Sequence, residues 1–159
     1  MKPDIKIILS ILSLTIILTA CESNKEKAGP STIINEEAAI KSTMIDMWDA
    51  IEKQDLTRYA NHVHPNFTQF GETDSVLLEG KSAEVNAIKS WMEHSSGVHT
   101  EMIEPKITIQ DNVAWVVYYW SDAGLTHGKP FTSKGKSTRI FVKENDQWLC
   151  IHGHYTLLP

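Results

Sequence analysis

The spacing of apolar residues in the first half of the chain predicts three helices. Between residues 35 and 53 apolar side chains recur at helical spacing, and charged side chains occupy the opposite face, as in an amphipathic helix. Asp55 can cap a second, shorter helix that runs to His62, and Pro65 ends it. Ser82 opens a third helix with its own apolar face.

The second half of the chain is predicted to form a sheet. A short strand over 67–70 precedes the third helix. After Ser96 the pattern becomes alternating or continuously apolar, which indicates four long strands at 99–110, 114–121, 136–144 and 147–157. The segment 124–130 is rich in turn-forming residues and is expected to be a loop. Helices first and antiparallel strands later predict an α+β domain with the helices on one face of the sheet.

Both faces of the second long strand are apolar. Tyr118 and Trp120 point to one side, and Trp115 and Tyr119 point to the other. A single layer of helices covers only one face, so the uncovered aromatic residues would form a large exposed patch. We therefore expect a homodimer or a larger ring, with Trp115 and Tyr119 at the interface between subunits.

The amino terminus is expected to be a cleaved lipoprotein signal. Two lysines in 1–6 precede an apolar run over 7–18, which as a helix of about 18 Å is too short to span a bilayer core of about 30 Å. Leu18-Thr19-Ala20-Cys21 resembles the lipobox of bacterial lipoproteins, in which the cysteine receives lipid. Cys21 is thus the expected lipidation site and 1–20 the signal peptide.

This signal predicts localisation at the cell envelope. Residues 21–34 are expected to form a flexible tether to a domain over 35–159. Glu22 after the lipidated cysteine would favour the periplasmic face of the outer membrane in a Gram-negative organism. If Cys21 carries lipid, Cys150 has no partner for an intramolecular disulfide, and its apolar strand is typical of a core cysteine.

Length and charge limit the classes of function. A chain of 159 residues has room for one domain. Its net charge of -5 and pI near 5.8 provide no basic stripe, so nucleic acid is not an expected partner.

Several motifs resemble a known family. The order of helices and strands is similar to the nuclear transport factor two-like superfamily, a cone in which a strongly curved sheet wraps three helices, and to its SnoaL-like domains. The closest motif match is the association domain of calcium/calmodulin-dependent protein kinase type II. The matching motifs are Leu78-Glu79-Gly80, Val98-His99-Thr100, Glu104-Pro105, Thr138-Arg139-Ile140-Phe141 and Ile151-His152-Gly153-His154-Tyr155-Thr156.

The resemblance implies a pocket, but with altered chemistry. The association domain binds small carboxylates through several arginines and a histidine. Arg139 matches one of those arginines, whereas Tyr155 and Trp120 stand at or near the positions of two others, and Glu84 falls near the histidine. The pocket here is therefore expected to be less cationic and more aromatic, which puts a carboxylate ligand in doubt.

Arg139 is the leading candidate for a ligand contact. An unpaired charge in an apolar strand costs several kcal/mol, so the side chain should face a pocket, a carboxylate or a subunit boundary. An ion pair with Glu79, Glu84 or Asp122 is the structural alternative. The full set of expected pocket residues is Arg139, Tyr155, Trp120, Tyr118, Trp48, Tyr59, His64 and Glu84.

His152 and His154 share one face of the last strand and are assigned to the interface or to a hydrogen-bonded core. Spacing fixes no third ligand, so no metal is expected. The first short strand also lacks the aspartate base that ketosteroid isomerases of the superfamily use. His64 with Asp46 or Asp49 would be a possible dehydratase pair, but nothing in the spacing selects it.

The leading hypothesis is therefore a non-catalytic, oligomeric small-molecule-binding domain without a cofactor. Its ligand is not identified by the sequence. A cofactor-free isomerase, dehydratase or hydrolase acting on a hydrophobic substrate is the enzymatic alternative. A structural or protein-binding module with a filled cone is the third possibility.

Overall fold

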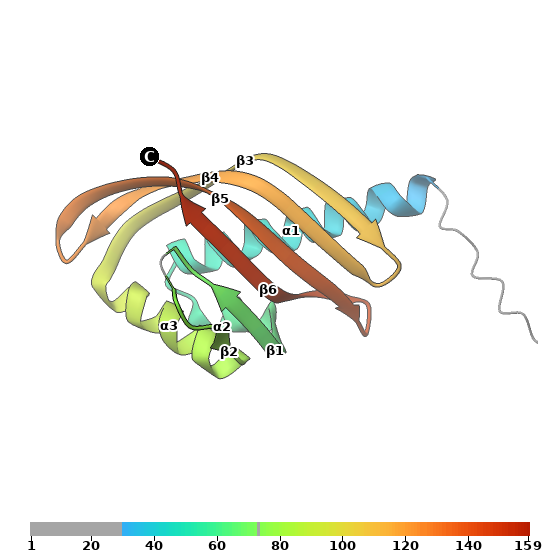
Figure 1. Cartoon of the computed structure of the whole chain (residues 1–159), viewed down its shortest axis with the longest axis horizontal. Helices are drawn as coiled ribbons and strands as arrows, with labels where there is room; N and C mark the ends of the chain where they lie inside the picture. Colours follow the sequence, from blue (N-terminus) through green and yellow to red (C-terminus); the bar gives the residue numbers. More distant parts are fainter. Residues whose placement is uncertain (1–29, 73) are drawn as a thin grey trace, which may run out of the picture.

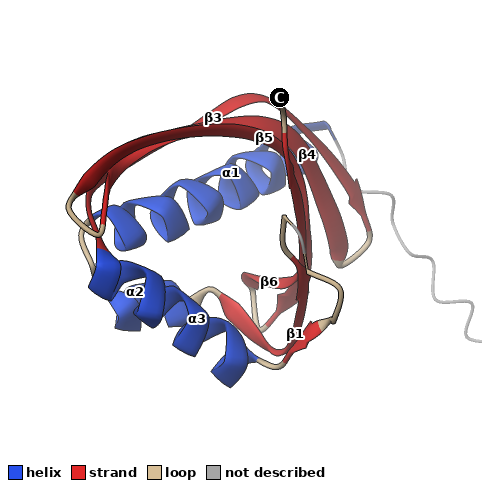
Figure 2. Cartoon of the chain, turned by 60° about the vertical axis from the view of Figure 1, so that its left-hand side comes forward, coloured by secondary structure: helices blue, strands red, loops and turns tan. Residues whose placement is uncertain are grey.

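Three helices lie against the concave face of a six-stranded sheet in the part of the chain that the structure describes (Figures 1 and 2). The structure is a computed structural model and describes residues 30–72 and 74–159. Its elements are α1 (Pro30–Glu52), α2 (Leu56–Asn61), β1 (Val63–Phe70), β2 (Leu78–Glu79), α3 (Lys81–His94), β3 (Ser95–Gln110), β4 (Val113–Thr126), β5 (Lys129–Glu144) and β6 (Gln147–Leu157). The predicted α+β cone is confirmed.

The strands follow the order β2-β1-β6-β5-β4-β3. The four long strands β3 to β6 pair antiparallel with their neighbours, as predicted. The pairing of β1 with β6 is parallel, which the sequence pattern did not indicate. Because β1 and β6 run side by side, the first strand of the chain, which follows α2, pairs with the carboxyl-terminal strand and brings Gln69 opposite Gly153.

Strand β4 shows how the sheet divides its two faces. Along it, buried and exposed residues alternate, because successive side chains of a strand point to opposite faces. Tyr118 and Trp120 are buried on the concave face against the helices, whereas Trp115 and Tyr119 are exposed on the convex face.

The core lies between the helices and the concave face. Helix α1 contributes an apolar stripe that includes Ile40 and Met44, and it packs against Phe67 of β1 and Phe141 of β5 in one continuous cluster of buried side chains. Every member of this cluster lies between residues 40 and 150. The described residues therefore carry a core of their own.

Helix α1 is longer than predicted. It begins at Pro30 rather than Asn35, so it includes the last residues of the predicted tether. Proline is well suited to the first turn of a helix, where its missing N–H has no partner to lose.

The predicted loop over 124–130 is wrong. Strands β4 and β5 continue through it and are joined by a two-residue turn at His127 and Gly128. Both residues have positive φ, 49° and 73°, which is the conformation that the tightest hairpin turns require. Glycine and proline are typical of loops, so their presence in this segment kept the sequence pattern from indicating an extended hairpin.

Pro65, predicted to end the second helix, lies inside β1, and α2 already ends at Asn61. The pairing of β1 with β6 shifts register between Val63 and Thr68, and a proline without an N–H donor is tolerated at such an irregularity. The strand therefore starts four residues before the predicted Phe67.

The expected signal peptide, the lipidation site Cys21 and residues 21–29 of the tether lie outside the described residues. Within the described part, no helix is long and apolar enough to span a membrane.

Candidate functional site

A cavity of about 300 Å³ lies between the concave face of the sheet and helices α1 and α3. Its apolar and aromatic walls come from the three helices, β4 and β6, and polar side chains from α3, from β1, β3, β4 and β5 and from the loop after β1 interrupt them. The lining residues are Trp48, Ile51, Tyr59, Gln69, Glu72, Glu84, Ala87, Ile88, Trp91, Thr100, Tyr118, Trp120, Asp122, Ser137, Arg139 and Tyr155. Mostly apolar walls with a few converging polar groups are typical of a small-molecule site.

A chain of hydrogen bonds crosses the buried end of the cavity. The Tyr59 hydroxyl donates to Glu84 Oε1 at 2.5 Å, and Gln69 Nε2 donates to Glu84 Oε2 at 3.4 Å. Arg139 Nη1 in turn donates to Gln69 Oε1 at 3.1 Å. The amide of Gln69 therefore joins the buried cation to the buried carboxylate, and both Glu84 oxygens accept a hydrogen bond.

Arg139 is 7% exposed and forms no ion pair with a carboxylate of the described residues. Its guanidinium carbon lies 5.7 Å from the centre of the Trp48 ring, within the range of a cation–π interaction. Burial opposes its charge, but the surrounding acidic groups, among them Tyr118 and Glu84, more than offset burial and hold the pKa of Arg139 above its usual value. The structural alternative, an ion pair with Glu79, Glu84 or Asp122, does not form.

Two strand glycines make room for these side chains. A Cβ at Gly153 would lie 2.6 Å from Arg139 Nη1 and 2.7 Å from Gln69 Oε1. A Cβ at Gly135 would lie 2.4 Å from the Trp120 ring. Because real Cβ atoms do not approach so closely, any larger residue at either position would displace a wall of the cavity.

Two donors on the cavity wall have no hydrogen-bond partner within the described residues. They are the hydroxyl of Tyr118 and the indole Nε1 of Trp120, both buried. Leaving such a group unpaired costs about 1–3 kcal/mol. A bound acceptor would remove that cost.

The opposite end of the cavity carries carboxyl groups. Burial raises the pKa of Asp122, although the hydrogen bond donated by the Ser133 hydroxyl partly offsets it. Burial also raises the pKa of Glu72, and repulsion from Asp122 and Asp74 raises it further. Burial likewise raises the pKa of the Tyr155 phenol.

Seven of the eight predicted pocket residues line this cavity, and His64 is the exception. His64 is buried elsewhere, with Nε2 at 3.3 Å from Glu144 Oε1 and Nδ1 accepting from the Asn66 N–H. The hypothetical pair of His64 with Asp46 does not form, since Asp46 contacts His62 Nε2 at 2.5 Å instead.

Gln69 is the most informative residue that the sequence pattern did not select. A neutral amide is not a catalytic base, so Gln69 gave no functional signal in the sequence, although alternation with Phe67 places both on the concave face. The sequence pattern could have identified Trp91 and Ile88 as cavity residues, because helical spacing places them on the apolar face of α3. No sequence feature marks Glu72 as a cavity residue, since it follows a strand in a segment with the pattern of a turn.

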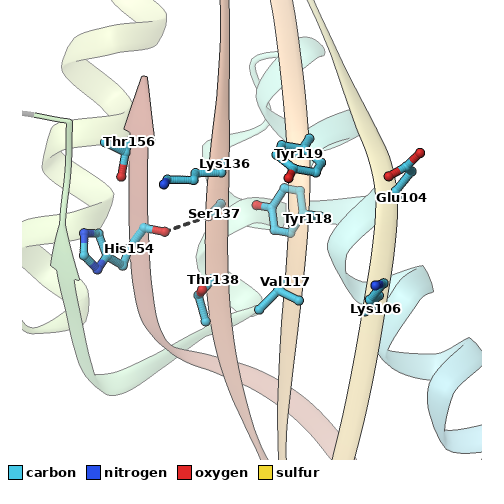
Figure 3. Close-up of a pocket in the computed structure, with 10 residues that line it drawn as sticks. All are labelled: Glu104, Lys106, Val117, Tyr118, Tyr119, Lys136, Ser137, Thr138, His154 and Thr156. Atoms are coloured by element: carbon cyan, nitrogen blue, oxygen red, sulfur yellow. Dashed lines mark hydrogen bonds between the residues drawn. The ribbon is translucent and has the colours of Figure 1, made fainter. Parts of the chain in front are cut away.

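The four residues predicted for the subunit interface, Trp115, Tyr119, His152 and His154, lie in different environments. Trp115 and Tyr119 are exposed on the convex face at 39% and 49%. A shallow groove of about 470 Å³ lies on this side of the sheet. Tyr119 and His154 are among the lining residues drawn in Figure 3. His152 instead contacts the Thr68 hydroxyl through Nδ1 at 2.8 Å, and burial together with repulsion from His154 lowers its pKa.

Cys150 is buried beneath the site. Its thiol is fully enclosed, and burial raises its pKa to about 11 despite the nearby Arg139. A thiol with such a pKa is almost entirely protonated at neutral pH and does not act as a nucleophile. In the described part of the chain, no three His, Cys, Asp or Glu side chains group in a way that would hold a metal ion.

The chain has the cystatin-like fold that NTF2-like proteins share. It is similar to a proposed dehydratase of the NTF2-like family from Streptomyces avermitilis, with a TM-score of 0.75 and 12% identity over 80% of this chain and 99% of that one. It is also similar to a proposed calcium/calmodulin dependent protein kinase II association domain from Xanthomonas campestris, with a TM-score of 0.64 and 16% identity over 78% of this chain and 86% of that one.

The chain belongs to the SnoaL-like domain family, whose model matches residues 40–158. It is 26% identical over 156 residues to calcium/calmodulin-dependent protein kinase type II of Caenorhabditis briggsae. That match covers 86% of this chain but 29% of the kinase, so the chain spans less than a third of the relative's length.

Proposed function

We propose that this SnoaL-like domain is a non-catalytic binding module for a small, largely apolar molecule. The observation that supports it most is the pairing of an aromatic cavity of about 300 Å³ with two buried donors, Tyr118 Oη and Trp120 Nε1, that have no partner within the described residues. The ligand would place an acceptor on these donors and its apolar body against the tryptophan walls.

The hydrogen bonding at the buried end favours binding over catalysis. Glu84 is 1% exposed, and its two oxygens already accept from Tyr59 and Gln69. A general base needs a free oxygen within reach of the substrate. Glu84 therefore holds Gln69 and, through it, Arg139 in place.

A cofactor-free dehydratase or isomerase is the second candidate. Asp122 and Glu72 favour it, because raised carboxyl pKa values beside a cavity are typical of acid–base catalysts. Turnover of a bound compound that stops in Asp122→Asn would support the enzyme. Unchanged compound after prolonged incubation would support the binding module.

Binding to the cavity is testable through the indole N–H signals of the tryptophans. A library of small aromatic compounds is titrated into 15N-labelled protein, residues 21–159 with Cys21→Ser. We expect shifts at Trp48, Trp91 and Trp120, which line the cavity, and none at Trp115 on the convex face. A library without any ligand that shifts the cavity signals would contradict the binding module.

A cavity-filling variant provides the matched control. Ala87→Trp places a large side chain on a lining position of α3, whereas Ala39→Trp places the same side chain on an exposed position of α1. The first substitution should abolish the shifts caused by the best ligand, and the second should leave them unchanged. Equal binding by both variants would place the ligand outside the cavity.

The convex face supports self-association as part of the same proposal. Ile103, Val117 and Tyr119 are exposed side by side on β3 and β4, and such patches are typical of protein interfaces. The protein should sediment as a dimer or larger at micromolar concentration, and Val117→Lys should give a monomer. A monomeric wild-type protein would contradict this arrangement.

Membrane anchoring completes the proposal. The lipobox-like segment that ends at Cys21 would attach the domain to the envelope through lipid. Cys21→Ser should abolish incorporation of labelled fatty acid and release the protein from the membrane fraction. Unchanged labelling and fractionation would remove the anchor from the proposal.

A further inference from the structure

Charge changes in a fixed order along the concave face of β4 and β5. On this face, three successive pairs of residues lie opposite one another: Tyr118 with Ser137, Trp120 with Gly135, and Asp122 with Ser133. Arg139 lies one such step further, beside Val116. At about 3.3 Å per residue, the backbone positions of Tyr118 and Asp122 are about 13 Å apart. The cavity therefore holds the Arg139 cation, linked to the Glu84 carboxylate through Gln69, at its buried end and carboxyl groups at its outer end.

At the acidic end, no cationic side chain of the described residues pairs with the carboxyl groups. Asp122 accepts from the Ser133 hydroxyl, and Glu72 lies close enough to Asp122 for repulsion to raise its pKa. Neither carboxyl group forms an ion pair with a Lys, Arg or His of the described residues. Two neighbouring carboxyl groups without a counter-ion favour the arrival of a positive charge.

The aromatic residues at this end suit an organic cation. Trp120 precedes Asp122 by two residues on the same face, and its ring contacts Tyr155 edge-on with centroids 6.3 Å apart. Trp91 lines the cavity from α3. An ammonium group can bind both a carboxylate and the face of an aromatic ring. A metal ion with its water shell does not bind the ring face.

The buried donors place a second requirement on the same ligand. Trp120 is 8% exposed and Tyr118 is 4% exposed, and their indole N–H and hydroxyl groups lack partners within the described residues. These side chains lie between Arg139 and Asp122. A ligand that reaches the carboxyl groups with a cation would meet these donors with its other end.

We propose that the ligand is an organic amine with a hydrogen-bond acceptor at the far end of an aromatic or aliphatic body. Its ammonium group lies between Glu72 and Asp122, and its acceptor faces the Tyr118 hydroxyl and the Trp120 indole. This inference rests on the proposed binding function and specifies the chemical class of the ligand. It also accounts for Tyr155 and Trp120 at or near positions where the association domain has arginines, because the cavity then selects against carboxylates.

Three probes with the same phenol ring test the charge preference. Tyramine carries an ammonium group, 3-(4-hydroxyphenyl)propanoate carries a carboxylate, and 4-ethylphenol carries no charge. Calorimetric titration of residues 21–159 with Cys21→Ser should give an affinity for tyramine about tenfold above that for 4-ethylphenol, with the propanoate weakest. Tyramine should shift the indole signals of Trp91 and Trp120 and leave Trp115 unchanged.

Neutral variants then locate the charge. Asp122→Asn and Glu72→Gln should each weaken tyramine binding about fivefold and leave 4-ethylphenol binding unchanged. Glu37→Gln, at an exposed position of α1, removes the same charge far from the cavity and should change neither. Retained 4-ethylphenol binding shows that the cavity variants are folded.

The outcomes separate the two proposals. Propanoate binding as tight as tyramine, with shifts at the cavity tryptophans, would overturn the amine and leave the binding module standing. An unchanged preference for tyramine in both cavity variants would also overturn it. The amine is overturned as well if none of the three probes shifts a cavity signal, whereas the binding module falls only if the wider library also fails.

Discussion

The two faces of strand β4 carry similar residues and serve different purposes. On the concave face, Tyr118 and Trp120 are buried, border a cavity and keep unpaired donors. On the convex face, Trp115 and Tyr119 are partly exposed to solvent, and Tyr119 lines a shallow groove. The difference arises from what covers each face, since the helices and the small residues Gly135 and Gly153 shape only the concave side. Aromatic residues alone therefore do not identify a pocket.

The largest contrast between the faces should be in stability. Phe141→Ala removes a fully buried ring of the concave core and should lower the free energy of unfolding by about 3–5 kcal/mol. Trp115→Ala removes a ring that is partly in solvent and should cost less than about 1 kcal/mol in the monomer. Urea unfolding of both variants measures this contrast, and equal losses would show that the convex face is covered.

The hydrogen-bonded end of the concave face should also contribute strongly. Tyr59→Phe removes the donor to Glu84 and keeps the ring, so the loss should be about 1.5–3 kcal/mol. Tyr119→Phe on the convex face is the matched control, and it should change stability by less than about 0.5 kcal/mol. Similar stability of the two variants would contradict a structural role for the Tyr59–Glu84 bond.

Gly153 should be sensitive although it has no side chain. Gly153→Ala places a methyl group against Arg139 and Gln69 and should cost about 1–3 kcal/mol and weaken the best cavity ligand. Thr156→Ala, at an exposed position of the same strand, should affect neither property. Chemical denaturation and calorimetric titration check the two effects separately. Unaltered ligand binding in Gly153→Ala would show that the Arg139–Gln69 pair lies outside the binding site.

The smallest expected effect is a change in the pH dependence of stability. The folded pKa of Asp122 is raised above its ordinary value of 3.8, so the folded state retains a proton that the unfolded state releases. Its stabilising contribution is complete below pH 3.8 and is lost as the pH rises through the folded pKa. Asp122→Asn should therefore flatten the fall in unfolding free energy above pH 3.8. An identical slope in the variant would show that Asp122 does not contribute.

The sequence predicted the fold and most of the cavity because both follow from periodicity and from a few motifs. Alternation along β4 placed Tyr118 and Trp120 together, and the resemblance of Thr138-Arg139-Ile140-Phe141 to a motif of the association domain placed Arg139 beside them. His64 was misplaced because its partner, Glu144, is 80 residues away in the chain. Long-range pairs of this kind leave no trace in local spacing.

The pairing of strands was harder to predict than their existence. The tight turn at His127 and Gly128 depends on two positive φ values, which the neighbouring Pro130 obscures. The parallel neighbours β1 and β6 are more than 75 residues apart, and hydrophobic pattern does not report the direction of pairing. Glu72 was not predicted as a cavity residue for a similar reason, because its position beside Asp122 depends on how the loop after β1 folds back.

Because the thiol of Cys150 is enclosed, the thiol reactivity of the folded protein would report on lipid attachment at Cys21. The sequence holds two cysteines, and a thiol reagent used at neutral pH on folded protein would not react with Cys150, since its pKa is about 11. A lipidated Cys21 would have no free thiol either, because its sulfur would be in a thioether. The moles of maleimide taken up per mole of folded protein would thus equal the unlipidated fraction, and a spectrophotometer would suffice to follow processing of the amino terminus.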